Sequence, residues 1–140
     1  MKVRTALMVV SALSLAPGAM CQERPKVTGI SHLAVYTTDP AKAESFYVHD
    51  LGAFKGLDPE NSAGVRYSFS ATQFVEVLPL PAGSASVNRL DHAAFNTSDA
   101  DAMRKYLQAH GVEVPSSVTK AGDGSEYFEV KDPEGNKVQL

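Results

Sequence analysis

The amino-acid sequence predicts an α+β fold made of two copies of one β-α-β-β-β unit, and three observations lead to this prediction. The ten residues from Ile30 align with the ten from Leu90 at a constant offset of 60, with His, Ala, Thr and Asp matching themselves. In each copy this run closes with an aspartate, and a glycine comes about a dozen residues later, as at the start and stop of a helix. Apolar runs bounded by turn residues then indicate further strands. Two copies are too few for a solenoid, so we interpret them as half-domains that complete each other.

The first copy, module one, spans about 27–78. Its predicted strand, helix and three further strands lie at about 28–37, 40–49, 53–57, 64–70 and 73–78. Asp39 is the expected N-cap, Pro40 takes the first helical position, where a missing N–H costs nothing, and Gly52 ends the helix. Phe46 and Tyr47 are expected to form its inner face.

Module two spans about 88–140, after a linker at 79–87 that is rich in Pro, Gly, Ser and Ala. Its predicted strand, helix and three further strands lie at about 88–97, 100–109, 112–114 (extending as far as 119), 125–131 and 136–140. Asp99 caps the helix, Gly111 ends it, and Met103, Tyr106 and Leu107 form its inner face.

The N-terminus has the layout of a secretory signal peptide. Lys2 and Arg4 precede a short apolar run at 6–16, which ends at a Pro-Gly pair and is too short to span a bilayer. Cleavage before Gln22 would remove residues 1–21 and leave the folded domain at 22–140. Cleavage before Cys21, with a lipid anchor on that cysteine, is the alternative. Either reading predicts an exported protein, periplasmic or secreted.

Composition excludes several other classes of protein. The chain of 140 residues is 44% apolar, which is too much for a disordered chain, and its single cysteine excludes a disulfide scaffold. The formal net charge is −3 and becomes −5 when the signal peptide takes Lys2 and Arg4 with it. We therefore expect no nucleic-acid partner, and no apolar run indicates a large surface for a structural partner protein.

Strand alternation gives the two first strands one polar and one apolar face. His32 shares its face with Ala34 and Tyr36, whereas Leu33 and Val35 share the other, which should pack under the helix. In module two, by the same alternation, His92, Ala94 and Asn96 fall on one face and Ala93 and Phe95 on the other.

The same alternation places Glu76 and Gln139 on the histidine side of their strands, at equivalent positions of the two modules. If the two sheets join, His32, Glu76, His92 and Gln139 can converge on one concave face. Two imidazoles, a carboxylate and an amide oxygen suit a divalent ion such as Zn, Ni, Mn, Co or Fe(II).

Other interpretations of these residues stay open. Each histidine could be an ordinary half-buried strand residue, and a register slip of one residue would replace Gln139 by Glu129, because a slip reverses every face. His49 and His110 lie at predicted helix C-termini, where a cationic side chain favours the helix dipole, and we interpret both as structural.

The paired modules, the histidine in each first strand and the closing run Asp132-Pro-Glu-Gly-Asn-Lys-Val-Gln-Leu140 resemble the vicinal oxygen chelate superfamily. This superfamily includes glyoxalase I, extradiol dioxygenases, methylmalonyl-CoA epimerase and the fosfomycin and bleomycin resistance proteins. The resemblance covers about 27–140. It implies a cup-shaped, eight-stranded mixed sheet with helices on its outer face, often in a homodimer. It also implies metal ligation by His32, Glu76, His92 and Gln139.

The chain departs from that superfamily at Gln139, where glyoxalase I and the extradiol dioxygenases have glutamate. An amide cannot act as a general base, which leaves Glu76 as the catalytic base. With one anionic ligand, a divalent ion would keep a formal charge near +1 and favour an anionic or enediolate-like ligand. The departure counts against a dioxygenase.

The resemblance therefore favours a glyoxalase-like, metal-dependent lyase or isomerase that acts on a small compound with adjacent oxygens. Glu76 would remove a proton and the metal would stabilise the enolate. Tyr36, Arg66 and Asn96 are candidates to contact the substrate, although Tyr36 and Asn96 could only line the rim and Arg66 could be a solvated strand residue. The alternative is a non-enzymatic protein that sequesters a small molecule, as the bleomycin resistance proteins do.

Overall fold

The computed structural model describes residues 23–85 and 87–140. The expected signal peptide at 1–21, with the candidate anchor Cys21, lies outside the described residues. Among the described residues, no helix has the length and apolar character needed to cross a membrane.

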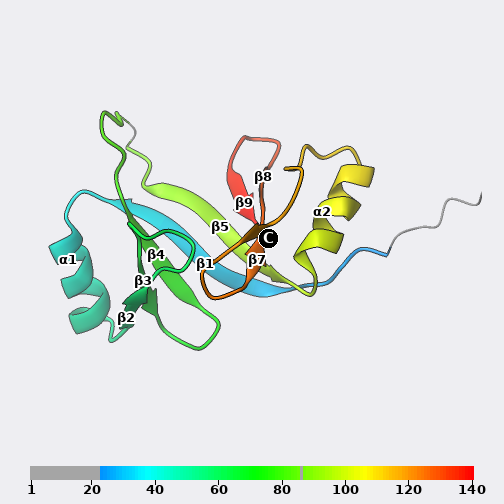
Figure 1. Cartoon of the computed structure of the whole chain (residues 1–140). Coiled ribbons are helices and arrows are strands. Elements are labelled where there is room, and N and C mark those ends of the chain that lie inside the picture. The colour runs from blue at the N-terminus through cyan, green and yellow to red at the C-terminus, as the bar shows by residue number, and fades with distance from the viewer. Residues whose placement is uncertain (1–22, 86) are drawn as a thin grey trace, which may run out of the picture.

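The described chain is an α+β structure with a mixed sheet, as the sequence predicts (Figure 1). Its elements are β1 (Val27–Thr37), α1 (Pro40–Glu44), the π-helical segment η1 (Ser45–Asp50), β2 (Phe54–Leu57), β3 (Val65–Ser68), β4 (Phe74–Pro79), β5 (Leu90–Thr97), α2 (Ala100–Ala109), β6 (Thr119–Lys120), β7 (Glu126–Tyr127), β8 (Glu129–Lys131) and β9 (Lys137–Gln139). Seven strands form one sheet in the order β2-β3-β4-β1-β5-β9-β8, and β6 and β7 form a second, two-stranded sheet.

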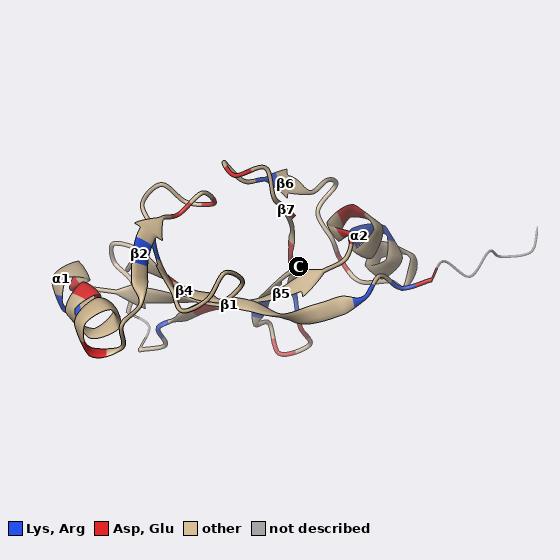
Figure 2. Ribbon diagram, turned by 90° about the horizontal axis from the view of Figure 1, so that it is seen from below, with Lys and Arg blue, Asp and Glu red and all other residues tan. Residues whose placement is uncertain are grey.

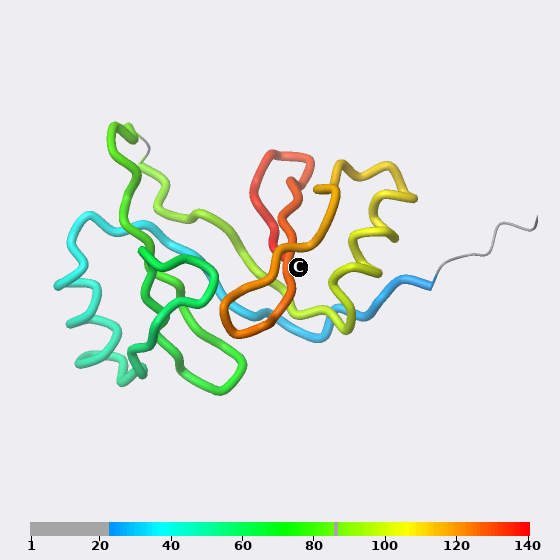
Figure 3. The backbone as a smooth tube through the Cα atoms, in the orientation of Figure 1, coloured from blue at the N-terminus to red at the C-terminus, as the bar shows by residue number. Residues whose placement is uncertain are grey.

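The two modules join inside one chain, through the first strand of each. β1 and β5 run antiparallel at the middle of the sheet, and each also pairs in parallel with the last strand of its own module, β4 or β9. The backbone in Figure 3 therefore passes twice through the centre of the molecule, with one module on either side. This pairing places His32 and His92 on adjacent strands.

The main sheet has one strand fewer than the eight expected. The strand expected at 112–114 is absent from the described residues there, because Val112 N–H donates back to the helix at Leu107 O (3.0 Å) and Pro115 has no N–H to give. The strand that forms in this part of the chain is β6, which pairs with β7 in the separate two-stranded sheet. Between β7 and β8, Phe128 exchanges two backbone hydrogen bonds with Leu140, so the run 126–131 still follows the C-terminal strand.

Both helices begin at the predicted caps. The Asp39 carboxylate accepts from Lys42 N–H (3.1 Å), and that of Asp99 accepts from Ala102 N–H (2.8 Å). The prediction that Phe46 faces inward is wrong, because its side chain is 50% exposed. The helix widens after Glu44 into η1, where Leu51 N–H donates five residues back to Phe46 O, and this changes the helical phase.

The helices lie at opposite ends of the molecule, so neither covers the middle of the outer sheet face (Figure 1). Val35 lies on the helix side as expected, because it packs, like Tyr47 and Val48 of η1, against the buried cluster of Ala53, Tyr67 and Val77. Leu33, which was also expected under the helix, is 44% exposed. That expectation is wrong because Leu33 lies at the junction of the modules, opposite Ala93 of β5.

Candidate metal centre

Two rows of side chains cross the inner face of the sheet at the junction of the modules. Residues opposite one another on adjacent strands form each row. The first row is Arg66, Glu76, Ala34, His92 and Lys137, and the second is Phe74, His32, Ala94, Gln139 and Glu129. Because alanine stands in the middle of each row and both alanines are fully buried, the longer side chains beside them can meet above the sheet. The strand register therefore brings together the four residues that the sequence suggests as ligands.

Three of these four residues offer ligand atoms within 4.8 Å of one another: His32, Glu76 and His92, all buried. The two Nε2 atoms are 3.0 Å apart, and the Glu76 Oε2 atom lies 3.9 Å from that of His32 and 3.8 Å from that of His92. Two nitrogen ligands at about 2.0–2.1 Å from one ion lie roughly 3.0–3.5 Å apart, so this spacing fits a shared divalent cation.

An unpaired carboxylate oxygen of Glu76 is also consistent with a cation at this place. Glu76 Oε2 is buried and has no hydrogen-bond partner, although buried carboxylate oxygens are normally paired. A cation between the two imidazoles would supply that partner. The group of His32, Glu76 and His92 can thus hold a divalent metal ion.

A β-bulge precedes each histidine and turns the residue before it toward the imidazole. On β1 the pairing shifts between Ile30 and His32, and Ser31 Oγ lies 3.1 Å from His32 Nδ1. On β5 it shifts between Leu90 and His92, and Asp91 Oδ2 lies 2.8 Å from His92 Nδ1. A carboxylate that accepts from Nδ1–H fixes the tautomer that leaves the Nε2 lone pair for a metal.

Asp91 contacts two further side chains besides His92. Its carboxylate also accepts from the Tyr36 hydroxyl, and its Oδ2 lies 2.6 Å from Lys137 Nζ. The Asp91 carboxylate raises the pKa of Tyr36 to about 12, first through this hydrogen bond. Tyr36 is therefore a neutral donor to Asp91 at ordinary pH. Asp91 joins residues from β1, β5 and β9 into one polar cluster.

The site favours neutral side chains when no cation is present. Burial, and then the nearby His92, lowers the pKa of His32 to about 4. Burial, and then a hydrogen bond to the Asp58 carboxyl, raises the pKa of Glu76 to about 9. Both shifts follow from the cost of burying charge, and a bound cation would reverse the preference at Glu76 by favouring its carboxylate.

Gln139 is buried on the same face, and its amide is held by a residue of the other module. Its Nε2 donates to Glu60 Oε2 (2.7 Å), and Glu60 lies in the loop between β2 and β3. The backbone of that loop meets the loop between β6 and β7, where Gly122 N–H donates to Pro59 O (2.8 Å). Figure 2 shows these two loops rising from the same side of the sheet. The face with the two histidines is thus the floor of a cup that the loops close.

Two cavities open on either side of this bridge. The larger, about 740 Å³, is lined by His32, and the smaller, about 320 Å³, by Glu76 and His92. Glu60 and Gln139 line both cavities. Both volumes are of the size that small-molecule sites occupy. A substrate could therefore approach the ligand group from either side.

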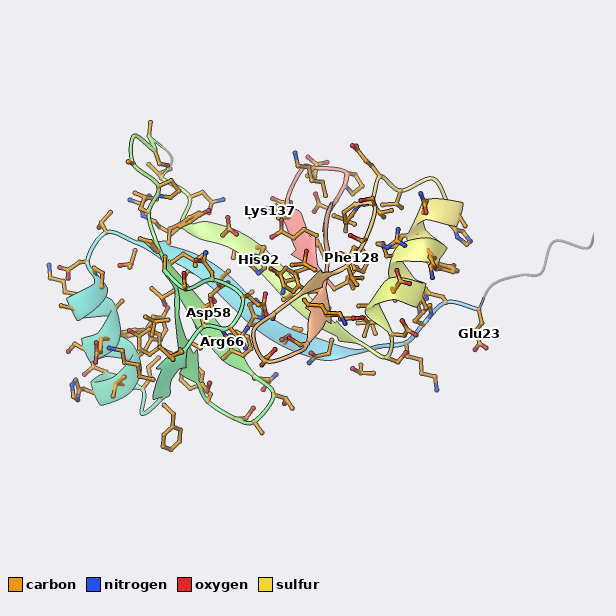
Figure 4. The ribbon with its side chains drawn as sticks, in the orientation of Figure 1. Glu23, Asp58, Arg66, His92, Phe128 and Lys137 are labelled. Atoms are coloured by element: carbon orange, nitrogen blue, oxygen red, sulfur yellow. The ribbon has the colours of Figure 1, made fainter. Side chains whose placement is uncertain are left out.

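The three predicted substrate contacts lie in different cavities. Tyr36 lines the smaller, whereas Arg66 and Asn96 line the larger. Arg66 is not the solvated strand residue considered above: it donates to Asp58 (3.2 Å) and to Glu60 (2.6 Å). Its guanidinium also lies 4.1 Å from the centre of the Phe74 ring. Figure 4 shows Arg66 and Asp58 side by side in module one, and His92 with Lys137 in module two.

Sequence reasoning missed four polar residues around this group: Ser31, Asp58, Glu60 and Asp91. Strict alternation assigns Ser31 and Asp91 to the wrong face, because it takes no account of the bulges. One hint exists in the sequence: Asp91 and His92 are adjacent polar residues within one strand, so strict alternation has to place one of them on the apolar face. Asp58 and Glu60 lie in a loop, where no periodicity marks the side that a side chain faces.

Residues 29–140 match the model of the Glyoxalase/Bleomycin resistance protein/Dioxygenase superfamily. No curated protein sequence matches the chain.

Several solved structures share the fold. Methylmalonyl-CoA epimerase from Mycobacterium tuberculosis superposes with a TM-score of 0.64 at 20% identity, over 81% of this chain and 87% of that one. A variant of the Streptomyces coelicolor methylmalonyl-CoA epimerase, in complex with 2-nitronate-propionyl-CoA, gives 0.65 at 19% identity, over 82% and 96%. A hypothetical protein from Bacillus halodurans gives 0.63 at 13% identity, over 84% and 93%. At these identities the likeness concerns the fold.

Proposed function

The chain belongs to the Glyoxalase/Bleomycin resistance protein/Dioxygenase superfamily, and from that premise we propose that it is a divalent-metal-dependent enzyme of the isomerase or lyase type. The observation that carries the proposal is the buried group of His32, Glu76 and His92, with the Glu76 Oε2 atom unpartnered between two imidazoles. A buried polar atom without a partner is costly, and a cation bound at this place would provide one. The proposed ligands are these three residues and Gln139.

We assign the proton transfer to Glu76. Its carboxyl is buried and lines the smaller cavity, where it would take a proton from a carbon next to a substrate carbonyl. A divalent ion held here supplies positive charge against the negative charge that develops on the substrate oxygen. Because that ion also favours the ionised form of Glu76, the base is ready only in the loaded protein.

The charges around the cup favour a small, uncharged substrate with adjacent oxygens, such as an α-hydroxycarbonyl compound. Among the described residues, Arg66 is the one arginine or lysine that lines the larger cavity, and Lys137 is the one that lines the smaller. Each is already paired with carboxylates, Lys137 with Asp91 and Glu129, and Arg66 with Asp58, Glu60 and Asp123. The phosphates of a coenzyme A ester, the ligand in one similar structure, would find no uncommitted cation there.

The test combines metal analysis with hydrogen exchange at carbon. Purified protein is titrated with Zn²⁺, Mn²⁺, Co²⁺ and Ni²⁺, and the loaded protein is incubated in D₂O with small α-hydroxycarbonyl compounds and, separately, with methylmalonyl-CoA. Proton NMR should show loss of the carbon-bound proton from the small compounds, and Glu76→Gln should abolish it. Absence of metal binding under every condition would overturn the proposal and favour the metal-free binding protein.

Two further parts of the proposal concern the whole molecule. We propose that the protein is exported, on the strength of the signal-like residues 1–21. We also propose a homodimer that covers the apolar outer face at the junction of the modules, where Ile30, Leu33 and Leu90 are exposed. Light scattering on the purified protein tests the dimer, and Leu33→Lys should shift it to a monomer.

A further inference from the structure

The strongest unexplained contact is the hydrogen bond that ties a proposed ligand of module two to a loop of module one. Gln139 Nε2 donates to Glu60 Oε2 at 2.7 Å, and both side chains are largely buried. An amide offers one oxygen and one nitrogen at nearly the same place, and only the oxygen can bind a divalent metal. The partner of the nitrogen therefore decides which atom of Gln139 is presented to the site.

Glu60 is itself held rigidly. Its other carboxylate oxygen, Oε1, accepts from Arg66 at 2.6 Å, and its backbone N–H donates to Asp58 Oδ1 at 2.9 Å. The adjacent Pro59 O accepts from Gly122 across the cup. Both oxygens of Glu60 are thus engaged, one by a cation and one by the amide. A side chain fixed in this way can orient its neighbour instead of following it.

The charges around Gln139 explain why an amide suits this position. Asp58, Glu60 and Glu76 place three carboxyl groups beside the site, and Arg66 is the cation among them. A glutamate at position 139 would set a fourth carboxyl group against Glu60 at hydrogen-bonding distance, where one of the two would have to take up a proton. Gln139 carries no negative charge, but the carboxyl groups of Asp58 and Glu60 lie nearby. The charge of a bound divalent ion would therefore be neutralised further than by its ligands alone.

We propose that Glu60 is a positioning residue, which holds the Gln139 amide by its nitrogen so that the oxygen is presented to the metal at His32, Glu76 and His92. This inference rests on the proposed metal site. It makes a loop of module one responsible for a ligand of module two.

A double-mutant cycle on metal affinity tests the proposal, with Co²⁺ as the probe and calorimetry as the readout. Glu60→Ala should weaken Co²⁺ binding about 10–100-fold, as loss of a group that orients a ligand typically does. Gln139→Ala should weaken it at least as much. The double variant should bind like Gln139→Ala alone, to within about twofold, because Glu60 then has no ligand to orient.

Two variants separate positioning from simple charge. Glu60→Gln removes the charge and one of the two acceptor oxygens. The oxygen that stays can still accept from Gln139 Nε2 while the contact with Arg66 is lost, so this variant should bind Co²⁺ within about threefold of the parent. If Glu60 acted through its charge, Glu60→Gln would lose affinity like Glu60→Ala, and Glu60→Ala would cost as much in the Gln139→Ala background. Either result overturns the proposal, as does an unchanged affinity in Glu60→Ala.

A measurement without metal keeps this inference distinct from the proposed function. The side-chain amide signals of Gln139 in a proton–nitrogen NMR spectrum are identified by their loss in Gln139→Ala. Glu60→Ala should shift them and speed their exchange with water, whereas Glu60→Gln should not. Metal binding in the parent with no effect of Glu60→Ala contradicts the inference alone. No metal binding in the parent contradicts the proposed function, and an unmoved amide signal contradicts the Glu60 contact itself.

Discussion

The two modules contribute equivalent residues to the candidate metal centre but distribute the negative charge differently. Module one provides His32 with a serine at Nδ1, and a carboxyl group, Glu76, in the second ligand position. Module two provides His92 with a carboxylate at Nδ1, and an amide, Gln139, in the second position. One module thus places its acid at the ligand and the other places it behind the ligand. The repeat thus gives the two modules equivalent residue positions, whereas the residue type and hydrogen-bond partner at each position decide where the negative charge lies.

The largest expected effect comes from removing either histidine. His32→Ala and His92→Ala should each lower metal affinity by more than the 10–100-fold expected for an orienting residue, because each removes a ligand itself. Calorimetric titration of each variant with Zn²⁺ measures the loss, and circular dichroism controls for folding. If one variant kept the affinity of the parent, the two modules would not share a site.

The pH dependence of the metal-free protein tests the acid in the ligand position. The raised pKa of Glu76, about 9 instead of 4.5, makes the folded state bind more protons, so stability falls as pH rises between these values. The lowered pKa of His32, about 4 instead of 6.5, has the opposite effect between 4 and 6.5 and cancels it there. Above pH 6.5 only the effect of Glu76 remains, and the free energy of unfolding should fall by about 3 kcal/mol between pH 6.5 and pH 9.

Denaturant unfolding in the presence of EDTA at pH 6.5 and pH 9 measures this decline. Glu76→Gln, which makes module one resemble module two, should remove it, and added metal should remove it in the parent. Equal stability of the parent at both pH values would mean that Glu76 is ionised in the metal-free protein.

A smaller effect is expected from the acid behind the ligand. Asp91→Asn should weaken metal binding about 10–100-fold, since the amide no longer fixes the His92 tautomer by charge. Tyr36→Phe, which removes another partner of Asp91, serves as the matched control and should change affinity far less. Equal losses in the two variants would show that Asp91 acts by holding the cluster together.

The smallest effect is expected at the equivalent position of module one. Ser31→Ala removes a neutral hydroxyl at 3.1 Å from His32 Nδ1, and neutral hydrogen bonds are weaker than charged ones. We expect a change in metal affinity of less than about threefold. A loss as large as that of Asp91→Asn would mean that the two bulged residues are equivalent after all.

The fold could be predicted in outline because its signals are local. Asp39 and Asp99 cap their helices as the sequence indicates, and the period of the strands places His32, Glu76, His92 and Gln139 on one face. The rest depends on departures from regularity. The bulges at Ser31 and Asp91 and the widened turn in η1 each change the facing of side chains without any change in composition. Leu33 is exposed because of how the modules join, which no local pattern contains.

The central claim is that His32, Glu76 and His92 hold one divalent metal ion. Crystals grown with Zn²⁺ and measured at its absorption edge test it most directly. The account predicts a single strong anomalous peak at about 2.0–2.2 Å from both Nε2 atoms and a carboxylate oxygen of Glu76. A peak at the other group with closely spaced ligand atoms, Asp91, His92 and Glu129, would contradict it, as would no peak among His32, Glu76 and His92 at saturating Zn²⁺.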